Sequence, residues 1–215
     1  GTFVFLRHSG IFALGDVDVP YPLYALVGFT FWQLFGSGLI AASSSIVKVG
    51  AMVGKISFSR KAIVLASIGQ TLVAFCIQLL SSIAMMLYYK IDFHASILLL
   101  PLVVLPLACL TIGAGMVLAL LNSIVRDVGY FLQTCVTFLM FLTPVLYAKP
   151  QVGIFATITD MNPLFYLVQA PRELLISGRI DSPVGFFAST LVACAVFVVG
   201  VAFFHITEAR IAERV

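Results

Sequence analysis

The sequence has few charged residues: Asp, Glu, Lys and Arg make up only 10% of its 215 residues, against about 25% in a typical soluble domain. Hydrophobic residues make up 61%, and the mean hydropathy is +1.13. This composition excludes an ordinary soluble domain and predicts an integral membrane protein. The formal net charge of +3 is small and dispersed, which argues against nucleic acid as a partner, because a nucleic-acid-binding protein concentrates basic residues on one face.

The sequence also lacks the groupings of a catalytic or metal site. Its three histidines (His8, His94 and His205) lie at the ends of apolar segments, without metal-ligand spacing or a Ser-His-acid grouping. The four cysteines lie inside apolar segments without the paired spacing of a metal or redox motif, so we assign them no chemistry. No ionisable residue lies at the centre of an apolar segment, which disfavours ion-coupled transport. We therefore expect no bound metal or cofactor and no enzymatic activity in this chain.

Five apolar segments have the length, or nearly the length, of a membrane-crossing helix, which needs about 20 residues. They are residues 21–47, 62–89, 97–121, 130–148 and 184–205. Their continuous apolar character excludes barrel strands, which alternate polar and apolar residues. The apolar stub before Arg7 is too short for a span or a signal peptide, and we interpret it as the end of a sixth helix. The sequence thus predicts an all-α, polytopic membrane helix bundle that forms a single transmembrane domain over residues 1–215.

Basic residues in the connections predict the orientation. The connection KVGAMVGKISFSRK carries Lys48, Lys55, Arg60 and Lys61 without an acid, so the positive-inside rule places it in the cytoplasm. Alternation then puts residues 122–129 and 206–215 inside, and residues 7–20, 90–96 and 149–183 outside. The GAMVGKIS stretch lacks the spacing of a phosphate-binding loop and is no nucleotide site. It is either a topogenic basic loop or a short amphipathic helix, with Val49 and Met52 on one side, that docks on a cytoplasmic partner.

The outer connection, residues 149–183, is unusually long and contains the apolar stretches VGIFATI and PLFYLVQAPRELLI. Both are too short to span a membrane, and such segments form re-entrant or interfacial helices. We expect them at the outer mouth of the bundle. Just before them, Pro144 is expected to bend the fifth span by removing a backbone hydrogen bond. The neighbouring charges Arg126-Asp127 and Arg172-Glu173 are more typical of local salt bridges than of sites.

Aromatic residues concentrate in two spans. They are Phe29, Phe31, Trp32 and Phe35 in the first complete span, and Phe131, Phe138, Phe141 and Tyr147 in the segment 130–148. Lipid-facing rings explain most residues of this kind. However, Phe31 and Phe35 share a helix face, as do Phe138 and Phe141, and such strips would stack on the apolar faces of sugars. Both interpretations remain open at this stage.

Four stretches carry a resemblance to a known family. They are VPYPLYALVGFTFWQLF (19–35), KISFSR (55–60), LNSIVRDVGYFLQTCVTFLMFLTPVLY (121–147) and NPLFYLVQAPRELLISG (162–178). In order and spacing they are similar to the ABC-2 family of ABC-transporter membrane subunits, and within it to the polysaccharide exporters for O-antigen, capsule and teichoic acid. The chain has SFSR where many relatives have an FPR-like sequence.

The resemblance implies an architecture and partners. It implies six transmembrane helices per subunit, a homodimer around a pore, and two cytoplasmic ATPase subunits that bind ATP and Mg. The cargo would be a lipid-linked polysaccharide, and the location the bacterial inner membrane. The resemblance further implies contacts with the ATPase through Val49, Met52, Lys55, Arg60, Arg126 and Asp127, an outer gate that includes Pro144, Asn162, Pro163, Arg172 and Glu173, and a substrate path lined by Phe29, Phe31, Trp32, Phe35, Phe138, Phe141 and Tyr147.

Two alternatives stand beside this expectation. One is an ABC-2 exporter of drugs, lipids or other small molecules. The other is a membrane scaffold or truncated remnant that transports nothing. The first predicts transport without a polymer biosynthesis pathway, and the second predicts stable membrane insertion without an associated ATPase.

Overall fold

The computed structural model of the chain describes residues 19–53, 59–147, 149 and 153–212, and all regular elements within these ranges are helical. In chain order these are α2 (Tyr21–Val53), α3 (Arg60–Tyr88), the 3₁₀ turn η1 (Ala95–Leu99), α4 (Leu100–Ile124), α5 (Asp127–Leu142), α6 (Ile154–Met161), α7 (Pro163–Ser177) and α8 (Pro183–Ala212). Within these ranges, four stretches are long and apolar enough to cross a membrane: α2, α3, η1 with α4, and α8. The predicted all-α polytopic bundle is thus confirmed.

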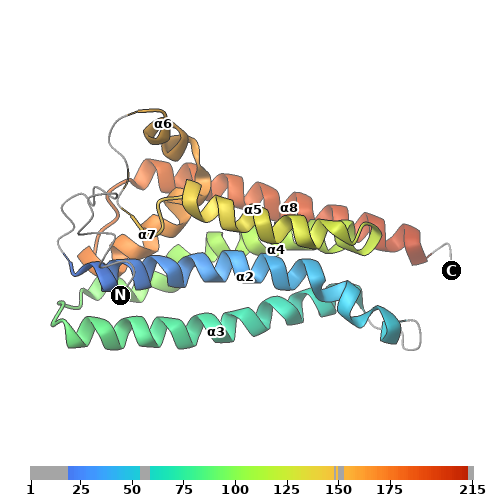
Figure 1. Cartoon of the computed structure of the whole chain (residues 1–215), viewed down its shortest axis with the longest axis horizontal. Coiled ribbons are helices and arrows are strands. Elements are labelled where there is room, and N and C mark those ends of the chain that lie inside the picture. The colour runs from blue at the N-terminus through green and yellow to red at the C-terminus, as the bar shows by residue number, and fades with distance from the viewer. Residues whose placement is uncertain (1–18, 54–58, 148, 150–152, 213–215) are drawn as a thin grey trace.

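The connections sort to the two ends of an elongated bundle (Figure 1). The start of α2, the end of α3, and the helices α6 and α7 lie at one end. The end of α2, the start of α3, the α4–α5 turn and the end of α8 lie at the other. We call these the outer and the inner end, following the orientation predicted from the basic residues. The predicted stub of a sixth helix lies outside the described residues.

Helix α4 occupies the centre of the bundle and contacts α2, α3, α5, α7 and α8. Its contact with α8 depends on two glycines that bring the backbones together. A Cβ atom at Gly113 would lie 2.5 Å from the Cα of Phe197, and one at Gly200 would lie 2.2 Å from the carbonyl oxygen of Gly113. Small residues at such crossings are typical of membrane helices, whose association depends on close packing.

Helix α3 lies against the bundle along one narrow face. Its buried residues recur at helical spacing: Val64, Ile68, Phe75, Ser82 and Met86. The Ser82 hydroxyl lies 3.1 Å from the Thr30 hydroxyl of α2, so a polar contact joins these two helices. The remaining faces of α3 expose large apolar side chains, as a lipid-facing helix does.

Helix α5 is shorter than the predicted span of residues 130–148. It has 16 residues, about 24 Å at 1.5 Å per residue, and residues 143–147 are not helical. The Thr143 amide makes the last helical bond, to the Leu139 carbonyl, and Pro144 has no amide hydrogen with which to continue. The predicted bend inside the span is therefore wrong, because Pro144 lies just beyond the end of the helix. Helix α2, by contrast, extends beyond the predicted limit at residue 47 to Val53.

Candidate functional site

The chain after α5 runs through five non-helical residues, 143–147, which we call the α5 break. Unpaired carbonyls are costly at membrane depth, and four consecutive carbonyls of the break receive side-chain donors from α2 and α7. The bonds run from Arg172 Nη2 to Pro144 (3.5 Å), Arg172 Nη1 to Val145 (2.9 Å), Tyr21 Oη to Leu146 (2.9 Å) and Tyr24 Oη to Tyr147 (3.4 Å). Side chains distant in sequence thus replace the lost helical hydrogen bonds of α5.

Among the described residues, Arg172 is the most buried cation at the outer end, with 2% of its surface exposed. Its guanidinium lies over the Tyr24 ring, and its Nη1 fits beside Gly28, where a Cβ atom would lie only 2.9 Å away. No ion pair joins Arg172 to Glu173 among the described residues, so the sequence-based interpretation of a local salt bridge is wrong. The local reason is that consecutive residues of a helix point in different directions, and Arg172 points toward the α5 break.

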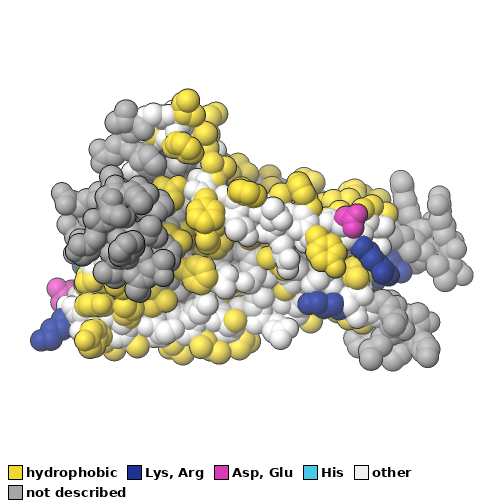
Figure 2. Space-filling model, in the orientation of Figure 1, with side chains coloured by type: hydrophobic (Ala, Val, Ile, Leu, Met, Phe, Trp, Pro, Cys, Tyr) yellow, Lys and Arg dark blue, Asp and Glu magenta, His cyan; other side chains and the backbone are white. Residues whose placement is uncertain are grey.

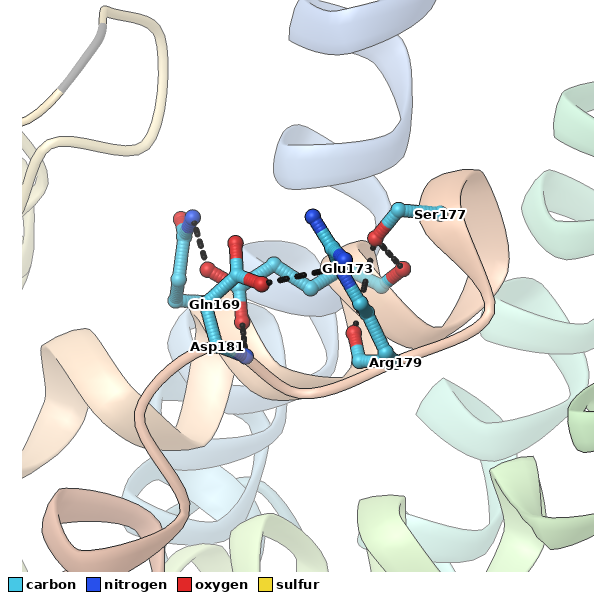
Figure 3. Close-up of polar contacts among 5 residues, drawn as sticks. All are labelled: Gln169, Glu173, Ser177, Arg179 and Asp181. Atoms are coloured by element: carbon cyan, nitrogen blue, oxygen red, sulfur yellow. Dashed lines mark hydrogen bonds and ion pairs between the residues drawn. The ribbon is translucent and has the colours of Figure 1, made fainter.

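Glu173 has its own set of partners, on α7 and in the connection that follows it (Figure 3). Its carboxylate accepts hydrogen bonds from the Gln169 amide (2.7 Å) and from the Asp181 backbone amide (2.9 Å). Burial raises the pKa of the Glu173 carboxyl above its ordinary value, and these two hydrogen bonds oppose the rise. Glu173 therefore ties the end of α7 to the connection that leads into α8.

The start of α7 is also attached to the break. Asn162 caps α7 by accepting a hydrogen bond from the Leu164 amide (3.0 Å), and Pro163 occupies the first helical position, as expected from its fixed φ. The Asn162 amide donates to the Thr143 hydroxyl (2.9 Å). The structure thus brings Pro144, Asn162, Pro163 and Arg172 into one cluster at the outer end, with Glu173 beside it. Their action as a gate remains a prediction.

A second feature is a strip of uncharged polar side chains, which we call the polar seam. Its members are Gln33, Ser37 and Ser44 of α2, and Gln133, Thr134 and Thr137 of α5. The α2 members are half-buried and the α5 members exposed, and within each helix the spacing places them on one face. The two helices are in contact, since a Cβ atom at Gly36 would lie 3.0 Å from Val136.

Figure 2 shows this side of the molecule. Uncharged side chains and backbone lie between patches of hydrophobic side chains, and the charged side chains are confined to the two ends. Hydroxyls of the polar seam bond mostly within their own helix: Ser37 to the Gln33 side chain, and Thr137 to the Gln133 carbonyl. The seam therefore leaves amide groups and hydroxyl oxygens open toward the exterior.

The predicted aromatic strips do not share one surface. Phe31, Trp32 and Phe35 are buried in the core of the chain, where the Phe31 ring packs 5.8 Å from Phe75 of α3 and the Trp32 ring 5.6 Å from Phe35. By contrast, Phe138 and Phe141 of α5 are 69% and 58% exposed.

The two remaining rings lie between these extremes. Phe29 and Tyr147 are half-buried, and the Tyr147 hydroxyl donates to the Phe141 carbonyl (2.6 Å). That these aromatics line a path remains a prediction, with Phe29, Phe138, Phe141 and Tyr147 the ones that reach the surface in this chain. Sequence reasoning missed the polar seam, whose signal was the helical spacing of Gln33, Ser37 and Ser44.

At the inner end, Asn122 joins α2 to the α4–α5 turn. Its amide donates to the Ser43 carbonyl (2.9 Å), and its oxygen accepts from the Gly129 amide (2.8 Å). Asn122 therefore joins α2, six residues before Val49, to the first turn of α5, two residues after Asp127. Arg126 and Asp127 are exposed and make no ion pair with each other in the described part of the chain.

The other predicted ATPase contacts lie nearby. Val49 is half-buried in the last turns of α2, and Arg60 begins α3. The side chain of Met52 and the whole of Lys55 lie outside the described residues. None of these positions is tested by the geometry of one chain, and their contact with an ATPase remains a prediction.

Comparison with known proteins agrees with this architecture. The family model of the ABC-2 type transporter matches residues 2–176. Two proteins of Klebsiella pneumoniae, each named O-antigen export system permease protein RfbA, are 26% and 24% identical to this chain over 202 residues. Each alignment covers 92% of this chain and 77% of the relative. A bundle of long apolar helices and a family match over most of the sequence lead to one conclusion: the chain belongs to the ABC-2 type transporter family and is a membrane subunit of such a transporter.

Proposed function

We propose that the chain is the permease subunit of an ATP-driven exporter that moves lipid-linked polysaccharide of the O-antigen type across the bacterial inner membrane. Two copies surround the path, and separate cytoplasmic ABC ATPase subunits bind ATP and Mg and hydrolyse the ATP. The chain itself binds no cofactor. ATP favours one state of the dimer through its differential affinity for the two states. The family match and the names of the relatives support this assignment.

The polar seam is the observation that carries the proposal. Its hydroxyls and amides can exchange hydrogen bonds with sugar hydroxyls, and the exposed rings of Phe138 and Phe141 present faces on which sugars stack. From Val128 to Leu142, α5 carries no Asp, Glu, Lys or Arg, so no strong charge would arrest a moving polymer. Many weak, similar contacts suit a cargo that slides past successive residues.

The same observation separates this proposal from its alternatives. An exporter of apolar drugs or lipids gains little from amides and hydroxyls along its path, because these groups would have to be desolvated without a partner. A scaffold without transport has no need of polar side chains exposed on α5 in the membrane, where they are costly. The polar seam therefore favours a cargo rich in hydroxyl groups.

Export of polysaccharide in cells tests the proposal. In a strain that lacks the natural permease, the complete subunit is expressed with its ATPase, either unchanged or with Gln133→Leu and Thr137→Val. Each lost hydrogen bond of about 1 kcal/mol slows transport by about fivefold, so the double variant should export much less polysaccharide at an unchanged level in the membrane. The matched control is Thr190→Val in α8, whose hydroxyl bonds within its own helix. Unchanged export by the double variant would contradict the proposal.

A second arm examines the cargo class. In the purified permease–ATPase complex, lipid-linked polysaccharide should stimulate ATP hydrolysis, and small amphiphiles should not. Stimulation by small amphiphiles alone would instead favour the drug or lipid exporter. Failure of any ATPase to copurify would favour the scaffold.

A further inference from the structure

Near the inner end of the bundle, α2 and α3 enclose a cavity of about 480 Å³, which we call the α2–α3 groove. Its walls include Ala41, Ser45 and Lys48 of α2, and Ala62, Ala66 and Gln70 of α3. The volume lies within the range of about 300–1,000 Å³ common for small-ligand sites. The groove lies along α3 and is therefore separate from the polar seam, which α2 forms with α5.

The shape of the groove suits a molecule that reaches into one leaflet of the membrane. Small side chains recur at a spacing of four residues on both helices, which places each pair on one helix face: Ala41 with Ser45, and Ala62 with Ala66. At 1.5 Å per residue, the wall from Ala62 to Gln70 is about 12 Å long, and half of the hydrocarbon core is about 15 Å thick. Ala62, Ala66 and Gln70 are exposed in this chain, so the groove opens toward lipid.

The mouth of the groove is positive. Lys48 is exposed there and forms no ion pair within the described residues, in contrast to Lys61, whose ammonium lies 3.3 Å from the Glu208 carboxylate. No Asp or Glu is among the described residues that line the cavity, and the first turn of α3 carries no acid. One ammonium group matches the single negative charge of a phosphodiester. Anionic lipids of the cytoplasmic leaflet also attract basic residues near the membrane surface.

The neutral polar groups of the groove fit the region below a phosphate. In the described part of the chain, the Gln70 side chain forms no hydrogen bond, so its amide is available to a ligand. Side chains of a helix lean toward its N-terminus, which for α3 is the inner end, so Gln70 leans toward the mouth. The hydroxyls of Ser45 and Ser67 donate to backbone carbonyls of their own helices (2.6 and 2.7 Å). These two side chains need no further partner and therefore tolerate an acyl chain.

We propose that the α2–α3 groove binds an anionic glycerophospholipid of the inner leaflet. The lipid phosphate would pair with Lys48, the Gln70 amide would donate to an ester carbonyl, and an acyl chain would pack against Ala41 and Ala66. This inference goes beyond the proposed function, because the ligand is a resident lipid and not the cargo. The lipid would fill the space between the two helices and so hold the start of α3 in place.

Binding to the purified complex tests the charge of the site. The complete permease with its ATPase is freed of lipid and mixed with phosphatidylglycerol, and native mass spectrometry measures the bound lipid. Lys48→Gln should raise the half-saturating concentration by about tenfold, the usual effect of one charged contact. The matched control is Lys90→Gln at the outer end, which should leave it unchanged. An equal loss in both variants would show unspecific attraction by net charge and overturn the inference.

A second pair of variants tests the shape of the site. Ala66→Phe places a ring in the groove and should reduce phosphatidylglycerol binding at least about tenfold. Ala84→Phe adds the same ring at an exposed position of α3 near the outer end, and binding should not change. Phosphatidylglycerol should also raise the melting temperature of the unchanged complex more than that of Lys48→Gln, because a ligand stabilises the folded state that binds it.

Three further ligands identify the source of the phosphate. Phosphatidylcholine, whose head group has no net charge, should bind more weakly than phosphatidylglycerol, and equal binding would contradict recognition of an anion. Glycerol 3-phosphate that binds as tightly as the lipid would show a site for free anions and overturn the inference. Undecaprenyl diphosphate that binds as tightly, with the same losses in Lys48→Gln and Ala66→Phe, would show a site for a polyprenyl carrier and also overturn it.

The remaining outcomes concern the ATPase and the cargo. Loss of the ATPase from Lys48→Gln during purification would show that this cation docks the partner, against the inference. Equal binding of phosphatidylglycerol by the unchanged complex, Lys48→Gln and Ala66→Phe would overturn it as well. The proposed function fails separately: if the seam variants export polysaccharide normally while phosphatidylglycerol binding depends on Lys48 and Ala66, the lipid site stands and the polysaccharide path does not.

Discussion

The guanidinium carbon of Arg172 lies 4.0 Å from the centre of the Tyr24 ring, and the two side chains together satisfy carbonyls of the α5 break. Tyr24 belongs to the first turns of α2 and Arg172 to the middle of α7. Their contact is a cation–π pair shielded from water, a setting in which such pairs are worth up to about 2 kcal/mol. The outer ends of three helices therefore meet at one cation.

The first prediction concerns this cation. Arg172→Leu removes donors to the carbonyls of Pro144 and Val145 and should lower the free energy of unfolding by about 1.5–3 kcal/mol, the usual value of a hydrogen bond to a charged group. Trp32, the single tryptophan, is buried and reports unfolding by its fluorescence. Arg179→Gln, at an exposed ion pair, should change stability by less than about 0.5 kcal/mol. Equal effects of the two substitutions would contradict the structural role of Arg172.

The second prediction compares two glycines in neighbouring helices. A Cβ atom at Gly28 would lie 2.5 Å from the Val145 carbonyl oxygen, whereas one at Gly69 of α3 would meet nothing within 4 Å. Gly28→Ala should therefore destabilise the chain by displacing the α5 break. Gly69→Ala should be neutral or stabilise by about 0.5–1 kcal/mol, because alanine is the better helix former. Thermal unfolding of both variants measures the contrast, and the same sign for both would be inconsistent with it.

The third prediction concerns the crossing of α4 and α8. Gly200→Ala places a Cβ atom 2.2 Å from the Gly113 carbonyl oxygen, and the helices must separate to accept it. We expect a loss of about 1–3 kcal/mol, as for other overpacked sites. Val199→Ala, on an exposed face of the same helix, is the control and should have a small effect. A stable Gly200→Ala variant would show that the two backbones are not in contact.

The fourth prediction concerns pH. Because burial raises the pKa of Glu173 above its ordinary value of 4.5, the folded chain binds this proton more tightly than the unfolded chain does. The contribution of Glu173 to stability is therefore largest below pH 4.5 and falls as the pH rises through the raised pKa. Glu173→Gln removes this titratable carboxyl, so the melting temperature of the unchanged chain, relative to that of the variant, should fall as the pH rises from the ordinary value of 4.5 through the raised pKa.

The control for this titration is Asp92→Asn, at an exposed position of the same end. Its melting temperature should follow that of the unchanged chain across the same pH range. A difference between the unchanged chain and Glu173→Gln that does not vary with pH would show that Glu173 acts only through its hydrogen bonds to Gln169 and Asp181.

The apolar runs were sufficient to predict the helices but not all of their ends. Length and hydropathy located α2, α3, α4 and α8 because a helix in lipid must satisfy its own backbone. They failed at the end of α5, since Val145, Leu146 and Tyr147 continue the apolar run after the helix has stopped. The helix can end there because the hydroxyls of Tyr21 and Tyr24, more than 100 residues earlier in the chain, and the guanidinium of Arg172 in α7 donate to the carbonyls that follow it. The sequence around the end of α5 contains no sign of these distant donors.

The faces of the helices were harder to predict than their positions. Helix α2 is apolar on most sides, so the spacing of Phe31 and Phe35 indicated a shared face without indicating whether it was buried or open. Close contacts determine which face of α2 is buried. Gly28 packs against the α5 break and Gly36 packs against α5. Gln33 and Ser37 therefore lie toward the exterior. Clusters predicted from resemblance, such as Asn162 and Arg172, were brought together by the fold, although their hydrogen-bond partners were not foreseen.

The separation in sequence between the α5 break and its donors imposes an order on synthesis. The Tyr21 hydroxyl and the Leu146 carbonyl are 125 residues apart, so at about 5–20 residues per second the ribosome delivers the acceptor about 6–25 s after the donor. Helix α2 can therefore enter the membrane well before the break that it must stabilise. Among the described residues, Tyr21 and Tyr24 are the donors to the break that are synthesised before it, and Arg172 follows later with α7. Helix α2 is therefore the surface against which the outer end of this subunit is assembled.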